Sequence, residues 1–292
     1  PVNYNINFSS HHPYNRNNGS MIPARGYQQL ISAGLYLEIG PLSIQFKPEH
    51  VYAQNKDFDG FWEGHYDVIW AKRYFLWNSI DMPEKFGDKT FNKSYLGQSN
   101  IKLNFKGLSF GISSENLWWG PSIRNSIMMS NHAKGFNHIS FNTTRPISTK
   151  IGNFEWQLVS GRLESSGFTP PGTERTYNGS TLYVPKINQN VKTDDWRYFQ
   201  GLVFTYSPKW INGLSIGFIK WAMMYSALVE GKYLYFMPGD PTYFPVFSNL
   251  FRSNDRYPDY EHQTDQAMGV FFRWLWKDSN AEIYAEFNYN DS

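Results

Sequence analysis

The chain has 292 residues, a net charge of +2 at pH 7 and no cysteine. The balanced charge, without a basic block, excludes a nucleic acid as the expected partner, and the lack of cysteine excludes disulfide scaffolds, zinc–thiolate sites and cysteine nucleophiles. No apolar run reaches the roughly 18 residues of a transmembrane helix, and mean hydropathy is −0.53. Aromatic residues make up 18% of the chain, which is typical of outer-membrane barrels with aromatic belts and also of soluble carbohydrate-active sandwiches.

Apolar and polar side chains alternate in short segments along the whole chain. Tyr4, Ile6 and Phe8 alternate with asparagines near the start, and Ile283 and Phe287 face away from the intervening polar residues near the end. This period of two predicts strands with one apolar and one polar face. The predicted strands, about 11 in number, are residues 2–8, 27–38, 41–53, 99–106, 108–114, 137–147, 152–162, 197–206, 213–221, 267–276 and 280–289. No helical period of comparable length appears, so the fold is predicted to be all-β.

Short and long connections alternate between these strands. Tight turns are expected at 40–41, 106–107, 151–153, 207–213 and 277–280, and long loops at 9–26, 54–98, 115–136, 163–196 and 222–266. Outer-membrane barrels have short periplasmic turns and long extracellular loops, whereas sandwiches mix loop lengths at both ends. The alternation of short turns and long loops therefore predicts an antiparallel transmembrane β-barrel of the outer membrane, with its long loops facing the cell exterior. A soluble sandwich or propeller is the alternative.

The number of predicted strands indicates whether these residues can form a complete barrel. Bacterial single-chain barrels have an even number of strands, and lipid does not tolerate an unpaired sheet edge. An odd count that ends on an edge strand therefore predicts that residues 1–292 form a single, incomplete barrel domain.

The sequence Asn55-x-Asp57-x-Asp59-Gly60 has the alternating oxygen side chains of a calcium loop. The acidic residue expected six positions after the glycine is replaced by Tyr66. A solvated acidic turn is therefore the favoured interpretation, and no metal or other cofactor is expected.

His138, Ser140 and Asn142 share one face of a predicted strand, and a histidine within hydrogen-bond reach can activate a serine. Because Ile139 and Phe141 take the opposite, lipid-facing side, the three polar side chains should point into the lumen, away from a lipid substrate. Polar lumen lining is the favoured interpretation, and no catalytic residue is predicted.

Two segments resemble a known family. Residues 115–133 read Glu-Asn-Leu-Trp-Trp-Gly-Pro-Ser-Ile-Arg-Asn-Ser-Ile-Met-Met-Ser-Asn-His-Ala, and Ile-Ser-Phe follows at 139–141. A strand that ends in a Trp-Gly-Pro turn, then an apolar stretch and a Ser-Asn-x-Ala element, resembles the capsule-assembly Wzi family. Residues 281–287, Ala-Glu-Ile-Tyr-Ala-Glu-Phe, resemble its second signature, aromatic-Ala-Glu-aromatic. His132 stands where the family usually has Asn, and Lys134-Gly135 replaces its common Arg-Pro.

The resemblance implies an 18-stranded outer-membrane barrel whose lumen is largely closed by loops. Members act as surface lectins that attach or organise capsular polysaccharide, without known enzymatic activity, and relatives in gliding bacteria are linked to surface adhesion and motility. The family barrel has 18 strands and about 11 are predicted here, which agrees with an incomplete barrel.

The Trp-Gly-Pro loop is the candidate carbohydrate site. Exposed indoles stack on the apolar faces of sugar rings, and amide, imidazole and guanidinium groups can bond to hydroxyls. The candidate binding residues are Trp118, Trp119, Arg124, Asn125, Asn131 and His132. In the alternative interpretation both tryptophans pack inside the loop or join the aromatic belt, and Gly120-Pro121 only shapes a turn.

The sequence leaves two functions open. The first is a non-enzymatic outer-membrane protein that binds or organises capsular or other surface polysaccharide. The second is a porin-like channel or a structural partner subunit of an envelope complex. The expected partners are surface polysaccharide, outer-membrane lipid and, for the second function, other envelope proteins.

Overall fold

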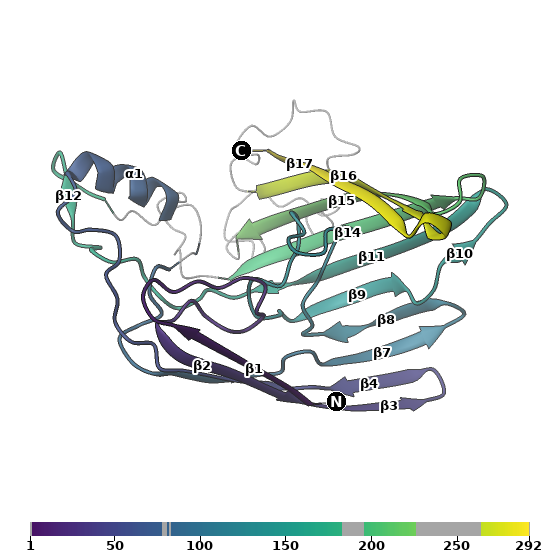
Figure 1. The fold of residues 1–292 in the computed structure, drawn as a ribbon, viewed down its shortest axis with the longest axis horizontal. Coiled ribbons are helices and arrows are strands. Elements are labelled where there is room, and N and C mark those ends of the chain that lie inside the picture. The colour runs from purple at the N-terminus through teal and green to yellow at the C-terminus, as the bar shows by residue number, and fades with distance from the viewer. Residues whose placement is uncertain (1, 78–80, 82, 183–195, 226–263, 292) are drawn as a thin grey trace, which may run out of the picture.

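The computed structural model describes residues 2–77, 81, 83–182, 196–225 and 264–291. The architecture is all-β with antiparallel strand pairs, as predicted (Figure 1). In the described residues two helical elements interrupt it, α1 (Asp67–Trp77) and the short 3-10 turn η3 (Lys277–Ser279). Neither helix in this part of the chain has the length and apolar character needed to span a membrane.

The largest sheet has eleven strands, most of which neighbour the next strand in sequence. They are β3 (Leu35–Ile39), β4 (Leu42–Phe46), β7 (Asn100–Phe105), β8 (Leu108–Ser113), β9 (His138–Thr143), β10 (Ile147–Ser148), β11 (Gly152–Leu163), β14 (Arg197–Pro208), β15 (Leu214–Tyr225), β16 (Thr264–Trp276) and β17 (Ala281–Asp291). Within the described residues the edge strands β3 and β17 each pair with one neighbour, so this sheet is open. Closure into an 18-stranded barrel stays a prediction.

A second sheet, of four strands, continues the first beyond a bend. Its strands, in order, are β1 (Val2–Ser9), β2 (Gly26–Ala33), β5 (Glu49–Ala53) and β6 (Phe91–Tyr95). The predicted strands 27–38 and 41–53 pair along their length, but the hairpin bends into β2–β5 and β3–β4. The bend falls at Gly34, where a Cβ would lie 2.7 Å from Cβ of Lys47, and at Pro48, which has no N–H for the ladder.

The side chains of the large sheet alternate between an apolar face, as predicted, and an opposite face that is polar on β8 and β9 but partly apolar on β11, β14, β15 and β16. Ile101, Phe110, Val270 and Ile283 lie on the outer face and are 46%, 55%, 52% and 48% exposed. The opposite face carries buried small and polar side chains, among them Ser109, Ser113, His138 and Ser140. This second face is called the inner face, because residues 115–131 pack on it.

Short turns gather at one end of the large sheet, the right end in Figure 1, and longer connections at the other. These are called the turn end and the loop end, and the predicted alternation of connections is confirmed. The predicted loops 54–98 and 163–196 also contain α1, β6, β12 (Thr176–Tyr177) and β13 (Ser180–Thr181). Most of the predicted loop 222–266 lies outside the described residues.

The helix α1 departs from the expectation of strands and loops alone. Trp70 and Tyr74, one helical turn apart, are buried against Phe61 and Leu182. The guanidinium of Arg175 lies 4.2 Å from the centre of the Trp70 ring. A helix of 11 residues is too short for its apolar pattern to stand out from the sequence.

Candidate functional site

Residues 115–131, the crossing segment, run over the inner face from β7 to β17. The segment begins at Glu115, whose carboxylate accepts hydrogen bonds from Lys102 Nζ at 2.9 Å and Asn100 Nδ2 at 2.8 Å. Burial raises the pKa of Glu115, but the hydrogen bond and charge of Lys102, with hydrogen bonds from Ser113 and Asn100, outweigh burial and hold that pKa below its usual range. The ionised carboxylate therefore ties the start of the segment to β7.

Trp119 anchors the middle of the crossing segment. Its side chain is 2% exposed and packs in an apolar cluster with Val159 and Phe199. The indole Nε1 donates to Gln157 Oε1 at 2.7 Å. A Cβ at Gly201 would lie 2.5 Å from the Trp119 ring, so the glycine makes room for it. Trp119 is thus part of the core, the position that the alternative interpretation expected for both tryptophans.

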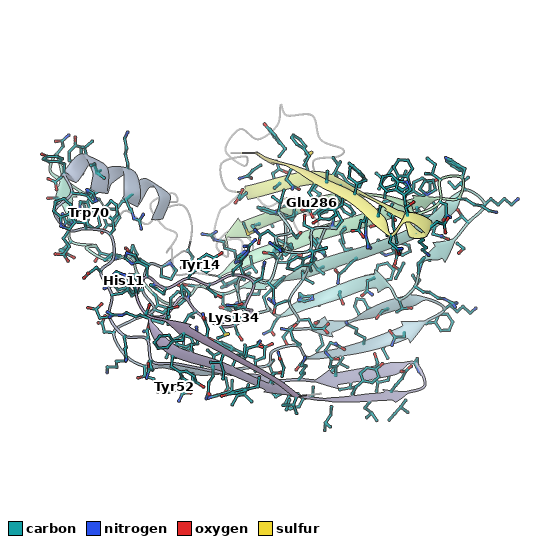
Figure 2. The ribbon with its side chains drawn as sticks, viewed as in Figure 1. His11, Tyr14, Tyr52, Trp70, Lys134 and Glu286 are labelled. Carbon is teal, nitrogen blue, oxygen red and sulfur yellow. The ribbon has the colours of Figure 1, made fainter. Side chains whose placement is uncertain are left out.

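The crossing segment meets β17 at Glu286, which Figure 2 labels. Oε1 of Glu286 accepts the backbone N–H of Ser122 at 2.9 Å, and Oε2 accepts that of Ile127 at 2.9 Å. Gly120 has a φ of +121°, and a Cβ there would lie 2.3 Å from Oε1 of Glu286. Only glycine combines this backbone conformation with so close an approach. The two signature segments, far apart in sequence, are therefore in direct contact.

The loop 10–25 closes over the crossing segment through Asn17. The Asn17 side-chain amide donates to the carbonyl oxygen of Arg124, and its Oδ1 accepts the backbone N–H of Asn131 at 3.1 Å. The backbone N–H of Asn17 also donates to Nδ1 of His132 at 3.5 Å. Three of the candidate residues are thus brought together by one asparagine that sequence analysis did not single out.

A cavity of about 830 Å³, called the loop-side cavity, lies between β1, the loop 10–25 and the crossing segment. Amide side chains from several segments line it: Asn3, Asn17, Asn18, Gln98, Asn116 and Asn131. Trp118 forms part of its wall, with its side chain 39% exposed and its Nε1 donating to the carbonyl oxygen of Ser122 at 3.0 Å. The cavity therefore combines an accessible indole with many hydrogen-bonding groups.

The charged groups of the loop-side cavity are mainly cationic. Arg16, Lys47 and Arg124 line it, and Glu49 is the acidic residue among the lining side chains. Glu49 is buried, and its carboxylate accepts hydrogen bonds from neutral groups, Ser20 Oγ at 2.6 Å and Gln98 Nε2 at 3.0 Å. The cavity thus presents guanidinium and ammonium groups on a wall of amides.

The six candidate residues end in three different places. Trp118, Arg124 and Asn131 line the loop-side cavity. Asn125, whose side-chain oxygen accepts a hydrogen bond from Arg16, and the exposed His132 lie beside it. Trp119 is the one buried away from it.

A second space, the turn-side cavity, lies on the other side of the crossing segment. Its volume is about 460 Å³, and Trp118 belongs to its wall as well. Gly120 and Pro121 line it from the crossing segment, and Glu155 and Arg273 line it from the strands. The crossing segment therefore separates two cavities along the inner face.

Comparison with known proteins gives the family. The family model of the capsule assembly protein Wzi matches residues 13–224, well over half of the chain. The chain belongs to the Wzi family. The matched range contains the Trp-Gly-Pro segment of this chain, whereas the resemblance at 281–287 lies outside it.

The fold is similar to that of Wzi from Escherichia coli, which is described as an outer membrane protein involved in group 1 capsule assembly and as a carbohydrate-binding β-barrel. The TM-score is 0.52 at 11% sequence identity, over 100% of this chain and 48% of that chain. The likeness shows the fold, and the chain spans about half the length of this Wzi structure. No curated protein sequence matches the chain significantly.

Several cavity residues of this Wzi-family chain escaped sequence analysis. Arg16, Asn17 and Asn18 come from a predicted loop, whereas Gln98 and Asn116 flank β7 and β8. The run Asn-Arg-Asn-Asn-Gly at residues 15–19 was the available signal, because amides clustered in a loop suit hydroxyl recognition. Its position opposite the Trp-Gly-Pro segment was not readable from the sequence.

The calcium-like motif serves the loop structure. Asn55 Nδ2 donates to the carbonyl oxygens of Phe86, Gly87 and Lys89, at 3.0, 3.0 and 2.9 Å. Asp57 is 2.5 Å from the Lys85 ammonium. In the described ranges no group of three His, Cys, Asp or Glu side chains is arranged to hold a metal ion.

The histidine–serine motif points inward, as predicted. His138 and Ser140 are buried on the inner face, and Nδ1 of His138 is 2.8 Å from the carbonyl oxygen of Phe136. Between the described side chains, no hydrogen bond joins His138 to Ser140, so the arrangement suits lumen lining.

Proposed function

We propose that this protein is a non-enzymatic outer-membrane β-barrel that binds capsular or other surface polysaccharide in the loop-side cavity. The observation that carries the proposal is the cavity itself, where Trp118 stands among amides and the guanidinium groups of Arg16 and Arg124. A sugar ring offers an apolar face for the indole and a rim of hydroxyls for the amides. Membership of the Wzi family and the carbohydrate-binding Escherichia coli relative support this choice of ligand.

The surroundings of the cavity support a surface site. The outer face of the sheet exposes apolar side chains in the pattern of lipid-facing barrel strands, and the short turns gather at one end. In bacterial barrels the long connections face the exterior. The loop-side cavity would then open toward the polysaccharide layer, within a single barrel domain.

A general porin is the less suitable alternative. A water-filled porin needs a continuous polar lumen, whereas Trp119 and its apolar cluster pack on the inner face. A role as structural partner subunit in the envelope requires no cavity, so it predicts that changes in the loop-side cavity leave glycan retention unaltered.

Trp118→Ala and Arg124→Ala test the proposal. Loss of the Trp118 indole should weaken retention on capsular polysaccharide by about 1–3 kcal/mol, the magnitude of aromatic stacking on nucleobases. Arg124→Ala should remove part of the salt dependence of binding if the glycan is acidic. The measurement is affinity per folded molecule of the full-length protein, on polysaccharide from the same cells, at two salt concentrations.

Trp62→Ala is the matched control, because Trp62 is 67% exposed but lies near α1, outside the cavity. It should leave retention unchanged. Wild-type retention by both Trp118→Ala and Arg124→Ala would reject the loop-side cavity as the site and favour the partner-subunit function.

A further inference from the structure

We propose that Glu286 is a positioning residue that holds the crossing segment over the barrel lumen and keeps the loop-side and turn-side cavities apart. The inference rests on the proposed barrel but not on glycan binding. It assigns a role to the carboxylate where the two signature segments meet, on the inner face of β17 (Figure 2).

The hydrogen bonds of Glu286 both serve the crossing segment. Each carboxylate oxygen takes one backbone N–H, Oε1 that of Ser122 and Oε2 that of Ile127. Hydrogen bonds from backbone N–H groups to an ionised carboxylate are stronger than those between neutral groups. Because the donors bracket residues 122–127, one side chain fixes both ends of this turn.

The backbone of the crossing segment is adapted to the carboxylate. Gly120 approaches Glu286 so closely that any Cβ would collide with Oε1. Within the turn, the Ser126 hydroxyl donates to the carbonyl oxygen of Trp119. The contact with β17 is therefore coupled to the part of the segment that carries Trp119 and Trp118.

Glu282 offers a natural comparison on the same strand and face. Its carboxylate accepts a hydrogen bond from Arg273 at 2.8 Å, which joins β17 to β16. Glu282 therefore connects strand to strand, whereas Glu286 connects strand to crossing segment. Removing either residue takes one inward carboxylate from β17, but only the loss of Glu286 should let the two cavities join.

Two anchors determine what happens when Glu286 is lost. Glu115 holds the start of the crossing segment to β7, and Trp119 holds its middle in the apolar cluster. Residues 120–127 would lose their tie to β17 and move away from it. The two cavities would then join along β17, although the barrel wall would remain paired.

Ion conductance of the full-length protein in planar lipid bilayers tests this inference. We expect a low conductance for the wild type and a several-fold increase for Glu286→Ala. Glu286→Gln should be intermediate, because an amide has one oxygen to accept a single N–H and its NH₂ group faces the other donor. Glu282→Ala should stay at the wild-type conductance.

Gly120→Ala provides a second variant that leaves β17 unaltered. Its Cβ should push the crossing segment off Glu286 and raise the conductance as Glu286→Ala does. Folding is monitored by heat-modifiable gel mobility. If Glu286→Ala does not fold, the conductance of Gly120→Ala tests the inference in its place. Wild-type conductance in folded Gly120→Ala and Glu286→Ala, or a wild type as conductive as the variants, would overturn the inference.

Glycan retention measured on the same samples separates this inference from the proposed function. A wild type that is closed but retains no polysaccharide rejects the function and leaves the role of Glu286 standing. Full retention together with unchanged conductance in the variants rejects the role of Glu286 and leaves the function standing.

Discussion

Trp118 and Trp119 are neighbours in sequence, yet their side chains have opposite environments. Trp118 is 39% exposed and borders both cavities, whereas Trp119 is 2% exposed and donates its Nε1–H to Gln157. Neighbouring residues in extended backbone point to opposite sides. The Trp119 indole therefore packs in the core, and the Trp118 indole points to the other side, where a ligand can reach it.

This difference predicts opposite effects of truncation. Trp119→Ala should lower the free energy of unfolding by about 3–5 kcal/mol, because it leaves a large cavity in the core. It also leaves Gln157 without its donor. Trp118→Ala should cost well under half of that and act mainly on glycan affinity. Denaturant unfolding of the protein in lipid vesicles measures both, and equal losses would show that both indoles are structural.

Among the elements, the strands of the large sheet have an apolar outer face. Their inner face is polar on β8 and β9 and carries the apolar cluster of Trp119 on β11, β14, β15 and β16. On β17, Ile283 and Phe287 are 48% and 68% exposed, and Glu282 and Glu286 take the inner side. In water the outer face would be an extended apolar surface, which soluble proteins avoid. The strands therefore suit a bilayer.

A charge on the outer face should be costly in lipid. Ile283→Arg should destabilise the folded protein by about 2–4 kcal/mol, the cost of a cation near the bilayer midplane. Tyr284→Arg is the matched control, because position 284 lies on the inner face, on the same side as the Arg273–Glu282 ion pair and away from the lipid. Folding yield and unfolding free energy in vesicles give the comparison. Similar costs for the two variants would contradict a lipid-facing outer side.

At the scale of the whole molecule, the crossing segment lies between the loop-side cavity and the turn-side cavity. The loop 10–25 and the crossing segment meet through Asn17, so the loop-side cavity belongs to no single element. The proposed function depends on the loop end facing the cell exterior.

Residues 1–292 contain no cysteine, so single cysteines placed in them can report the orientation directly. Ser180→Cys, on exposed β13, should react with a membrane-impermeant maleimide in intact cells. Lys209→Cys, on an exposed position of the turn between β14 and β15, should react only after the outer membrane is opened. Labelling of position 209 but not of position 180 in intact cells would invert the topology and remove the surface-binding proposal.

The sequence by itself determined most strands of the large sheet, their apolar outer face and the alternation of short and long connections. These features follow from local backbone geometry, because a period of two in hydrophobicity needs no knowledge of distant residues. The Trp-Gly-Pro segment also indicated the family.

Only the tertiary structure decided which groups meet. The contact of Glu286 with Ser122 joins residues 164 positions apart, and Asn17 reaches Asn131 across 114 positions. The bend at Gly34 and the buried side of Trp119 likewise depend on neighbours from other segments. Such contacts arise from packing and close approach in space, which a local pattern of residue types does not encode.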